Sequence, residues 1–240
     1  MTLQSRVSSH PGSEERSVEI LEKLRPVFVQ KGFDGASMQD LARAADMSVG
    51  NFYRYFPSKA AIVEAMIGVD LSELQAMFAL IVQSSDPMQG LRHAIRMRVT
   101  EQDCDGEGEL WAEITAAATR KADIGRAARR MEDAVVENLC LVFAATTGLA
   151  LAEAQERYRA RAELILMLVK GTAMRHTAPV AAAPPMTSPT TSPVVPPVAP
   201  PAAPPAPDDL TQLVLRMIDT ILDEITGGPS DQNPKVPAHA

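Results

Sequence analysis

Hydrophobic residues recur every three or four positions along most of this chain, which predicts a protein built from α-helices. The pattern covers residues 13 to about 178 and returns between 208 and 228. Within it we expect helices near residues 13–31, 38–45, 48–56, 58–82, 86–102, 109–120, 122–145, 151–175 and 208–225. The expected fold class is therefore all-α.

Short polar residues mark the helix starts between residues 37 and 59. Ser37 and Asp40 have the spacing of a capping box, and Ser48 can cap the next helix. Pro57 ends that helix and Ser58 can begin another. Asp46 lies at the turn, where a short polar residue tolerates the left-handed conformation. Two short helices joined by a tight turn are typical of a helix-turn-helix, which reads DNA.

The second short helix has two unlike faces. Val49, Phe52 and Phe56 share helical spacing, and we expect that face in the core. Polar and basic residues such as Asn51 and Arg54 occupy the other face, which is free to contact a partner.

Several residues between 31 and 59 together resemble the DNA-binding domain of the TetR family of bacterial repressors. They are Lys31-Gly32-Phe33, Ser37-Met38, Leu41-Ala42, Ala45, Met47-Ser48, Gly50, Phe52-Tyr53, Tyr55-Phe56 and Ser58-Lys59. The resemblance extends over roughly residues 13–71. It implies an N-terminal three-helix helix-turn-helix domain followed by a helical domain for ligand binding and dimerisation.

The resemblance also implies which side chains contact double-stranded DNA. The phosphate contacts would be Ser37, Tyr53, Tyr55 and Lys59. Base edges would face Gln39, Val49, Gly50 and Asn51, and Ser48 completes the DNA-binding set. Hydroxyl and ammonium groups do bind phosphates, and side-chain amides can pair with adenine.

Two positions depart from the family pattern. Asp46 replaces the glycine that is usual at the turn, so a slightly weaker affinity for DNA is expected. Pro26 lies inside the preceding helix, where its ring would clash with the carbonyl of Glu22 and a kink is expected. These departures leave open an alternative, a TetR-like helical interaction protein that has lost operator binding.

The charge balance bears on how DNA would be held. The net charge is -7, whereas residues 1–65 carry eight cationic and eight acidic side chains. A generally basic nucleic-acid binder is excluded, and DNA affinity must come from local contacts. The first ten residues lack the apolar segment of a signal peptide, and no apolar run reaches the length of a membrane helix. We expect a cytoplasmic protein with no membrane partner.

Residues with metal-binding or catalytic chemistry are sparse. Cys104 and Cys140 have no CxxC or histidine pairing, and the acidic segment 103–108 lacks the spaced ligands of a calcium loop. No nucleophile–base set, Gly-rich phosphate loop or HExxH run is present. We therefore expect no cofactor, no metal site and no enzymatic activity.

The rest of the chain divides by composition. Residues 1–12 are expected to form a disordered arm, 72–178 a helical ligand-binding domain, 179–207 a flexible linker and 229–240 a disordered tail. The linker contains twelve of the 19 prolines. The helix within 208–228 has a broad apolar face, formed by Leu210, Leu213, Val214, Met217, Ile218, Ile221, Leu222 and Ile225. By family habit it would pair with 151–175 and with both helices of a second chain; completion of the monomer core is the alternative.

An effector pocket is less visible in the sequence. Candidates are the methionine and aromatic residues of the second domain, which suit adaptable apolar pockets: Met77, Phe78, Met97, Trp111, Met131 and Phe143. Plain core packing is the alternative for most of them. The expected function is a ligand-responsive transcriptional regulator, a repressor that binds a palindromic operator as a homodimer and is released by a small apolar or amphipathic effector. The identity of the effector and the choice between repression and activation stay open.

Overall fold

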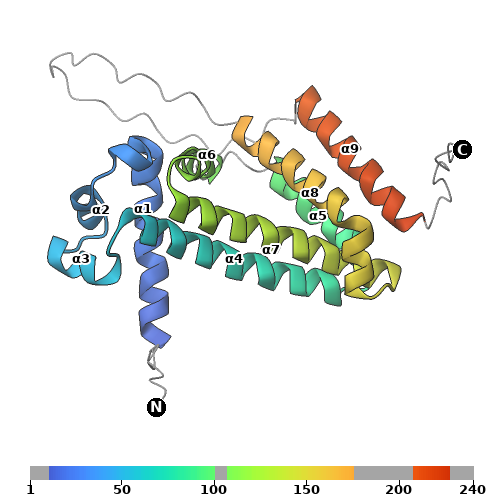
Figure 1. Cartoon of the computed structure of the whole chain (residues 1–240), viewed down its shortest axis with the longest axis horizontal. Helices are drawn as coiled ribbons and strands as arrows, with labels where there is room; N and C mark the ends of the chain where they lie inside the picture. The colour runs from blue at the N-terminus through green and yellow to red at the C-terminus, as the bar shows by residue number, and fades with distance from the viewer. Residues whose placement is uncertain (1–10, 101–106, 176–207, 228–240) are drawn as a thin grey trace, which may run out of the picture.

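The computed structural model describes residues 11–100, 107–175 and 208–227, and all regular elements within these ranges are helices (Figure 1). The helices are α1 (Pro11–Gly35), α2 (Met38–Ala44), α3 (Val49–Tyr55), α4 (Lys59–Gln83), α5 (Pro87–Thr100), α6 (Glu107–Ala118), α7 (Ala122–Thr147), α8 (Leu151–Arg175) and α9 (Asp209–Thr226). The predicted all-α class is confirmed. The predicted arm at 1–12, except for the first residues of α1, the linker at 179–207 and the tail at 229–240 lie outside the described residues.

The predicted caps begin their helices. The side chains of Ser37, Ser48 and Ser58 accept hydrogen bonds from backbone amides at the starts of α2, α3 and α4. Asp208 does the same for α9. Each cap satisfies an amide that has no carbonyl partner within its own helix. The short polar residues therefore fix where these four helices start.

The break in α1 lies at Gly32 and not at Pro26. The backbone at Gly32 has a φ of 69°, whereas no departure from helical angles occurs at Pro26, which lies exposed inside the helix. The kink predicted at Pro26 is therefore wrong in position. Glycine reaches a positive φ without the steric cost that other residues meet.

The hydrophobic core has two clusters, and neither matches a single predicted domain. The first joins α1, α2, α3 and the start of α4 to Leu110 and Ile114 of α6 and Ile124 of α7. The second joins the end of α4 to α5, the rest of α7, α8 and α9. The predicted boundary after residue 71 falls inside α4, and packing across α6 and α7 continues the core of the DNA-binding end.

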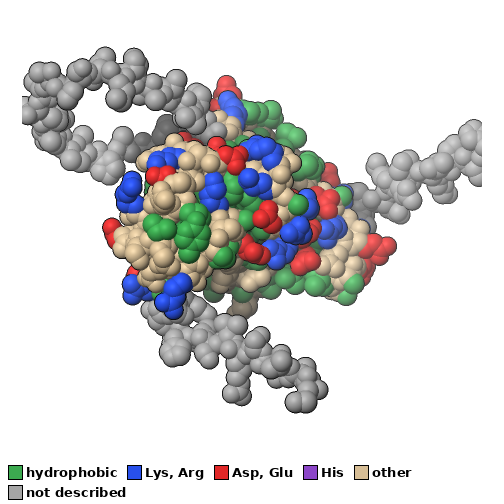
Figure 2. All heavy atoms as spheres, turned by 60° about the vertical axis from the view of Figure 1, so that its left-hand side comes forward, with side chains coloured by type: hydrophobic (Ala, Val, Ile, Leu, Met, Phe, Trp, Pro, Cys, Tyr) green, Lys and Arg blue, Asp and Glu red, His purple; other side chains and the backbone are tan. Residues whose placement is uncertain are grey.

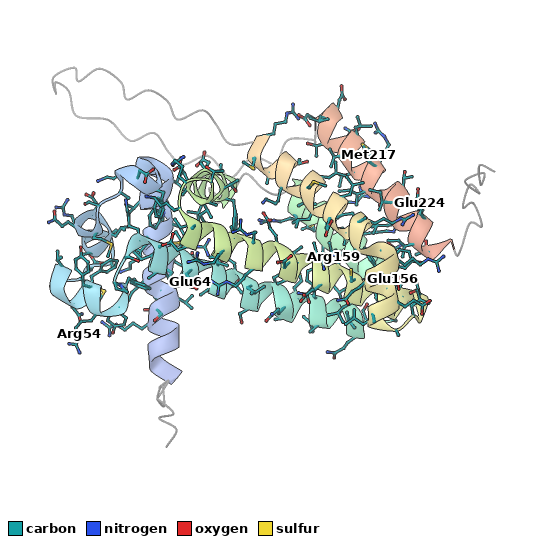
Figure 3. The ribbon with its side chains drawn as sticks, viewed as in Figure 1. Arg54, Glu64, Glu156, Arg159, Met217 and Glu224 are labelled. Atoms are coloured by element: carbon teal, nitrogen blue, oxygen red, sulfur yellow. The ribbon has the colours of Figure 1, made fainter. Side chains whose placement is uncertain are left out.

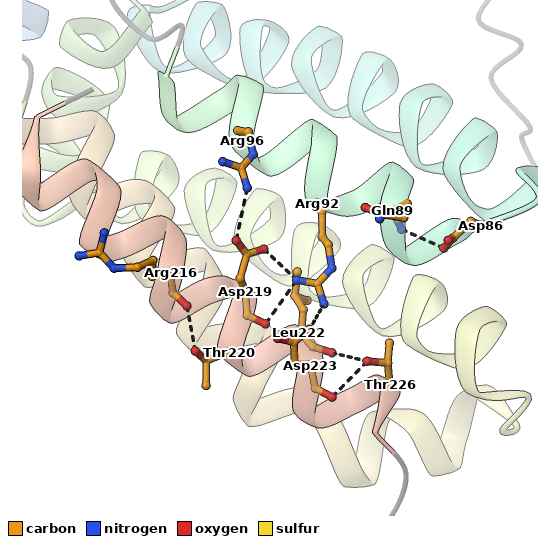
Figure 4. Close-up of polar contacts among 10 residues, drawn as sticks. All are labelled: Asp86, Gln89, Arg92, Arg96, Arg216, Asp219, Thr220, Leu222, Asp223 and Thr226. Atoms are coloured by element: carbon orange, nitrogen blue, oxygen red, sulfur yellow. Dashed lines mark hydrogen bonds and ion pairs between the residues drawn. The ribbon is translucent and has the colours of Figure 1, made fainter. Parts of the chain in front are cut away.

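The last helix is tied to the body by ion pairs. Arg92 of α5 donates to Asp219 at 2.8 Å and to Asp223 at 2.5 Å, and Arg96 reaches Asp219 at 3.3 Å (Figure 4). Val214, Ile218, Leu222 and Ile225 of α9 are buried in the second cluster. The position of α9 thus rests on apolar burial together with ionic contacts to α5.

Several residues that were predicted on apolar faces are exposed. Val49 is one, so it does not belong to the core face of α3. On α9 the exposed members of the predicted face are Leu210, Leu213 and Met217, and Leu164 and Met167 on α8 are exposed as well. Periodicity identified the apolar faces, but both helices bury only part of them.

The hydropathy of α4 raises the question of a membrane span. By length and composition this helix could cross a membrane, as could α7 and α8 taken as one bent span. Core helices of soluble proteins pass the same test. Since α4 buries Ile62, Val63, Met66, Ile67 and Phe78 against neighbouring helices, we describe it as a core helix.

Candidate DNA-reading surface

The turn between α2 and α3 is closed by backbone hydrogen bonds. Met47 donates to the carbonyl of Ala42 at 2.9 Å, and Asp46 donates to Arg43 at 3.1 Å. Asp46 has a φ of 55°, so the predicted left-handed conformation is confirmed. This pair of bonds around a left-handed residue is the Schellman pattern, in which glycine is the usual occupant. The turn forms with aspartate in its place.

The negative charge of Asp46 is paired within the protein. Lys23 of α1 contacts its carboxylate at 2.8 Å, and this hydrogen bond lowers the pKa of Asp46. Both side chains are exposed. Lys23 therefore offsets part of the charge that Asp46 adds near the reading helices, without fixing it in a buried site.

The start of α2 is a complete capping box. The amide of Asp40 donates to the hydroxyl oxygen of Ser37, and the amide of Ser37 donates to the Asp40 carboxylate. Lys31 contacts the same carboxylate at 2.7 Å. Hydrogen bonds from Lys31 and then Ser37 hold the pKa of Asp40 far below its usual value, so the box is charged at neutral pH.

The two hydroxyl groups at the helix starts are used differently. Ser37 donates its proton to Asp40 at 2.6 Å, so a phosphate contact would have to replace this bond. Ser48 accepts from the amide of Asn51 at 3.4 Å. A hydroxyl that accepts in this way can still donate, which leaves Ser48 able to bind a phosphate oxygen.

The helix α3 has one buried and one exposed face, and its aromatic residues Phe52 and Phe56 lie on the buried face, as the sequence predicted. Phe52 and Phe56 are buried, with ring centroids 5.5 Å apart. The exposed side of α2 and α3 carries Gln39, Val49, Gly50, Asn51, Tyr53 and Tyr55. These six belong to the DNA-binding set, and the structure brings them to one end of the molecule (Figure 1). In the view that brings this end forward, hydrophobic side chains lie among lysine and arginine side chains (Figure 2).

Lys59 has a different environment from the phosphate contact that the resemblance implied. Its ammonium donates to the backbone carbonyls of Phe33, Asp34 and Ala36 at 2.6, 3.1 and 2.9 Å. It also lies over the ring of Phe33, 4.9 Å from the centroid. Burial lowers the pKa of Lys59. Its donors point into the protein.

The DNA-binding set implied by the resemblance omits Arg54, although the sequence placed this cation on the free face of the helix. Arg54 lies on the exposed side of α3 and extends outward from the helix (Figure 3). Within the described ranges it has no ion pair of its own. A basic residue between Tyr53 and Tyr55 was the available signal, since an exposed arginine beside a reading helix suits a phosphate.

The six predicted pocket residues do not line one cavity. Phe78 and Phe143 are buried in the second cluster, whereas Trp111 and Met131 pack against the first. Met77 and Met97 are exposed. The prediction grouped residue types that suit a pocket, but these helices place them in three environments.

Two hollows in the described part of the chain have charged groups in their lining. One of about 410 Å³ lies between α4 and α7, with Glu64, Arg126 and Arg130 among its lining residues. Another of about 220 Å³ lies between α7 and α8, beside Glu132, Glu163 and Lys170. The larger hollow is lined by charged residues alone, whereas Val136, Leu166 and Met167 contribute an apolar part to the lining of the smaller one. None of the six predicted pocket residues lines either hollow.

Part of the chain is similar in sequence to known bacterial regulators. Residues 20–66 match a family described as "Bacterial regulatory proteins, tetR family". Over 98 residues the chain is 32% identical to the HTH-type transcriptional regulator EthR of Mycolicibacterium smegmatis, covering 40% of this chain and 45% of that protein. Over 71 residues it is 35% identical to the repressor KstR of Mycobacterium tuberculosis, covering 28% and 32%. The chain thus spans less than half the length of these two relatives.

Solved structures resemble the whole arrangement of helices. Salmonella enterica GusR matches with a TM-score of 0.58 and 18% identity, covering 92% of this chain and all of that one. A transcriptional regulator from Rhodococcus sp. Rha1 matches with a TM-score of 0.61 and 20% identity, covering 90% and 100%. At these identities the likeness concerns the fold: an N-terminal helix-turn-helix followed by a helical body.

Proposed function

We propose that the chain, whose residues 20–66 match the tetR family of bacterial regulatory proteins, is a transcriptional repressor that binds a palindromic operator as a homodimer. One observation carries the proposal. A complete helix-turn-helix presents Gln39, Asn51 and Tyr53 outward, while Phe52 and Phe56 anchor its second helix in the core. Amide and hydroxyl groups on an exposed, anchored helix suit contacts in a major groove.

Exposed apolar stripes on the last two helices support the dimer. Leu164, Met167 and Met174 recur along one face of α8, and Leu210, Leu213 and Met217 along one face of α9. Figure 3 shows Met217 on the outward side of α9. The two helices contact each other, so the stripes belong to neighbouring elements. Pairing α8 and α9 with the same helices of a second chain would bury both stripes in a four-helix interface.

A dimer also supplies affinity that one reading unit lacks. A single helix-turn-helix contacts few base pairs, and residues 1–65 have no excess of positive charge. Two units on half-sites one or more helical turns apart share one binding event. A repressor of this kind would act in the cytoplasm, where the DNA is.

Release by a small apolar or amphipathic effector remains part of the proposal. An effector that prefers a dimer whose reading units are wrongly spaced would weaken DNA binding by population shift. The long helix α4 is the proposed lever, because it contributes to the core beside the reading helices and to the core of the body.

The alternative, an interaction protein without operator binding, gains no support from the two unusual positions. Asp46 adopts the conformation that the turn requires, and Lys23 pairs its charge. Pro26 leaves the helical angles around it intact. Neither residue distorts the reading surface.

The test uses the full chain and DNA fragments selected from the source genome by their binding to it. We expect a dimer on a palindromic site, with affinity that falls steeply as salt rises. Tyr53→Ala is expected to weaken binding by about tenfold, as loss of a phosphate contact at the interface would. Leu80→Ala, on the far part of α4, is the matched control. Equal affinity of Tyr53→Ala and wild type would contradict the proposed reading surface, and failure to select any fragment would favour the interaction protein.

A further inference from the structure

We propose that the hollow between α4 and α7 binds a small anion that carries two or more negative charges, an organic phosphate or a dicarboxylate. Its basis is a group of three arginines on one face of α7, Arg126, Arg129 and Arg130. The effector in the proposed function is apolar or amphipathic, so this site takes a second class of ligand.

The hollow lies between two helices that run side by side (Figure 1). Its volume of about 410 Å³ falls within the range of small-molecule sites, roughly 300–1,000 Å³. The spacing of three and four residues places the three arginines on one face of α7, toward the same space. All six lining residues are charged: Glu64 of α4, and Asp123, Arg126, Arg129, Arg130 and Asp133 of α7.

Every carboxylate in this lining already has a partner. Glu64 contacts Arg130 at 2.5 Å, which joins α4 to α7. Asp133 contacts Arg159 of α8 at 3.4 Å. Asp123 accepts a backbone amide in the first turn of α7 at 3.0 Å. Among the described residues, therefore, only one of the three arginines in the hollow is paired with a carboxylate.

The other two arginines, Arg126 and Arg129, hold exposed guanidinium groups on the same face. Neither forms an ion pair with a residue that the structure describes. Nη1 of Arg129 lies 3.7 Å from the place where a Cβ on Gly125 would stand, so this group folds back along α7 toward the turn that carries Arg126. Like charges at this helical spacing repel each other. An anion bound between them would replace the repulsion with attraction.

The guanidinium groups select the class of ligand. Each presents a planar fork of N–H donors that matches the oxygens of a phosphate or a carboxylate. Two such groups without a carboxylate partner require at least two negative charges. Three carboxylates border the same space, so the ligand must be small enough to lie on the arginines without approaching them. A nucleic-acid backbone fits less well, and Figure 3 shows Glu64 at a separate place from Arg54, which lies on the outer side of α3.

Glu64 competes with such a ligand for Arg130. Its carboxylate occupies one of the three arginines, and its charge repels an anion in the hollow. Glu64→Gln removes both effects, so this variant should bind the anion several-fold more tightly. Replacing both Arg126 and Arg129 by glutamine should lower the affinity by about tenfold or more, because charge-assisted hydrogen bonds are lost.

Isothermal titration of the full chain measures this binding directly, without DNA. The probes are pyrophosphate for the phosphate class and succinate for the dicarboxylate class, each at constant ionic strength. We expect saturable binding of at least one probe, weaker binding in Arg126→Gln/Arg129→Gln and tighter binding in Glu64→Gln. Arg157→Gln/Arg216→Gln, which removes two exposed arginines of α8 and α9, is the matched control and should bind as wild type does.

The anion site is overturned if wild type binds neither probe, or if it binds no better than Arg126→Gln/Arg129→Gln or equally well as a weakened control. An affinity that does not rise in Glu64→Gln contradicts it as well, and a rise cannot come from loss of folding. If no probe binds and Arg126→Gln/Arg129→Gln loses affinity for DNA, these arginines contact DNA instead.

The contact between Glu64 and Arg130 also connects the site to DNA binding, a step that rests on the proposed function. An anion that draws Arg130 away from Glu64 removes a tie between α7 and α4, the proposed lever, and thereby shifts the population of α4 positions. We expect the probe that binds to lower the operator affinity of wild type and to leave that of Arg126→Gln/Arg129→Gln unchanged. Equal responses would overturn this connection. If wild type binds no DNA, the proposed function and the connection fail, whereas the anion site, measured without DNA, stands.

Discussion

At Gly50 the protein leaves open space where a side chain would stand. A Cβ built on this glycine meets nothing within 4 Å, although the residue lies in the first turn of α3. Glycine in a helix costs stability relative to alanine because its backbone is more flexible when unfolded. The folded protein therefore gains nothing from glycine here, which suggests that the backbone must approach something outside it.

Gly50→Ala is expected to change stability and DNA binding in opposite directions. The free energy of unfolding should rise by up to about 1 kcal/mol, because alanine favours the helix and fits without contact. DNA affinity should fall if the backbone of α3 lies against base edges. Urea unfolding and a DNA titration measure the two effects, and an unchanged affinity would remove Gly50 from the predicted DNA-binding set.

At the scale of the helices, glycine has opposite consequences in α1 and α4. Gly32 has a φ of 69°, and a Cβ there would lie 3.1 Å from a carboxylate oxygen of Glu113. That carboxylate accepts the amide of Phe33. Gly68 lies within α4, and its Cβ would meet nothing within 4 Å. Gly32 therefore allows the break in α1, whereas Gly68 only lowers the stability of α4.

We predict that Gly32→Ala lowers the free energy of unfolding by about 1–2 kcal/mol, since a residue with a Cβ is strained at positive φ and would crowd Glu113. Gly68→Ala, the matched control in an ordinary helical position, should raise it by up to about 1 kcal/mol. Thermal or urea unfolding of the two variants checks the pair. Equal effects of the two substitutions would mean that the backbone at Gly32 is not constrained as described.

The helices were predictable where the signal is local. Ser37, Ser48, Ser58 and Asp208 act on amides three residues away, so the sequence marks these starts directly. The environment of Lys59 was not predictable, because its carbonyl partners lie 23 to 26 residues earlier and carry no side-chain signature.

Periodicity has a similar limit on α8. It predicts that Met167 belongs to an apolar face, but it does not say whether the neighbour that covers this face comes from the same chain. The same applies to the proposed pocket, because residue type alone did not indicate that Trp111 and Phe143 pack in different clusters.

At the scale of the whole molecule, the exposed stripes on α8 and α9 should decide the oligomeric state. Met217→Glu places a charge in the centre of the proposed interface, where burying it unpaired is costly. We expect monomers in sedimentation and a large loss of operator affinity, with little change in helix content. Leu80→Glu is the control, because Leu80 is the more exposed residue at 72% and lies on α4 instead. A dimeric Met217→Glu protein would place the interface elsewhere.

The first core cluster contains residues of both the helix-turn-helix end and the helical body. This limits how the DNA-binding part of one protein could be swapped for that of a related protein. Its members include Leu110 and Ile114 of α6 as well as Leu24 and Phe52 of the reading end. A chimera that joins residues 11–71 of this chain to another regulator's body would lose these partners and expose Leu24 and its neighbours to mismatched side chains. A swap that also carries α6 and the first turns of α7 would keep the packing intact. The helix-turn-helix end therefore shares its core with α6 and α7 and is not packed as a module independent of them.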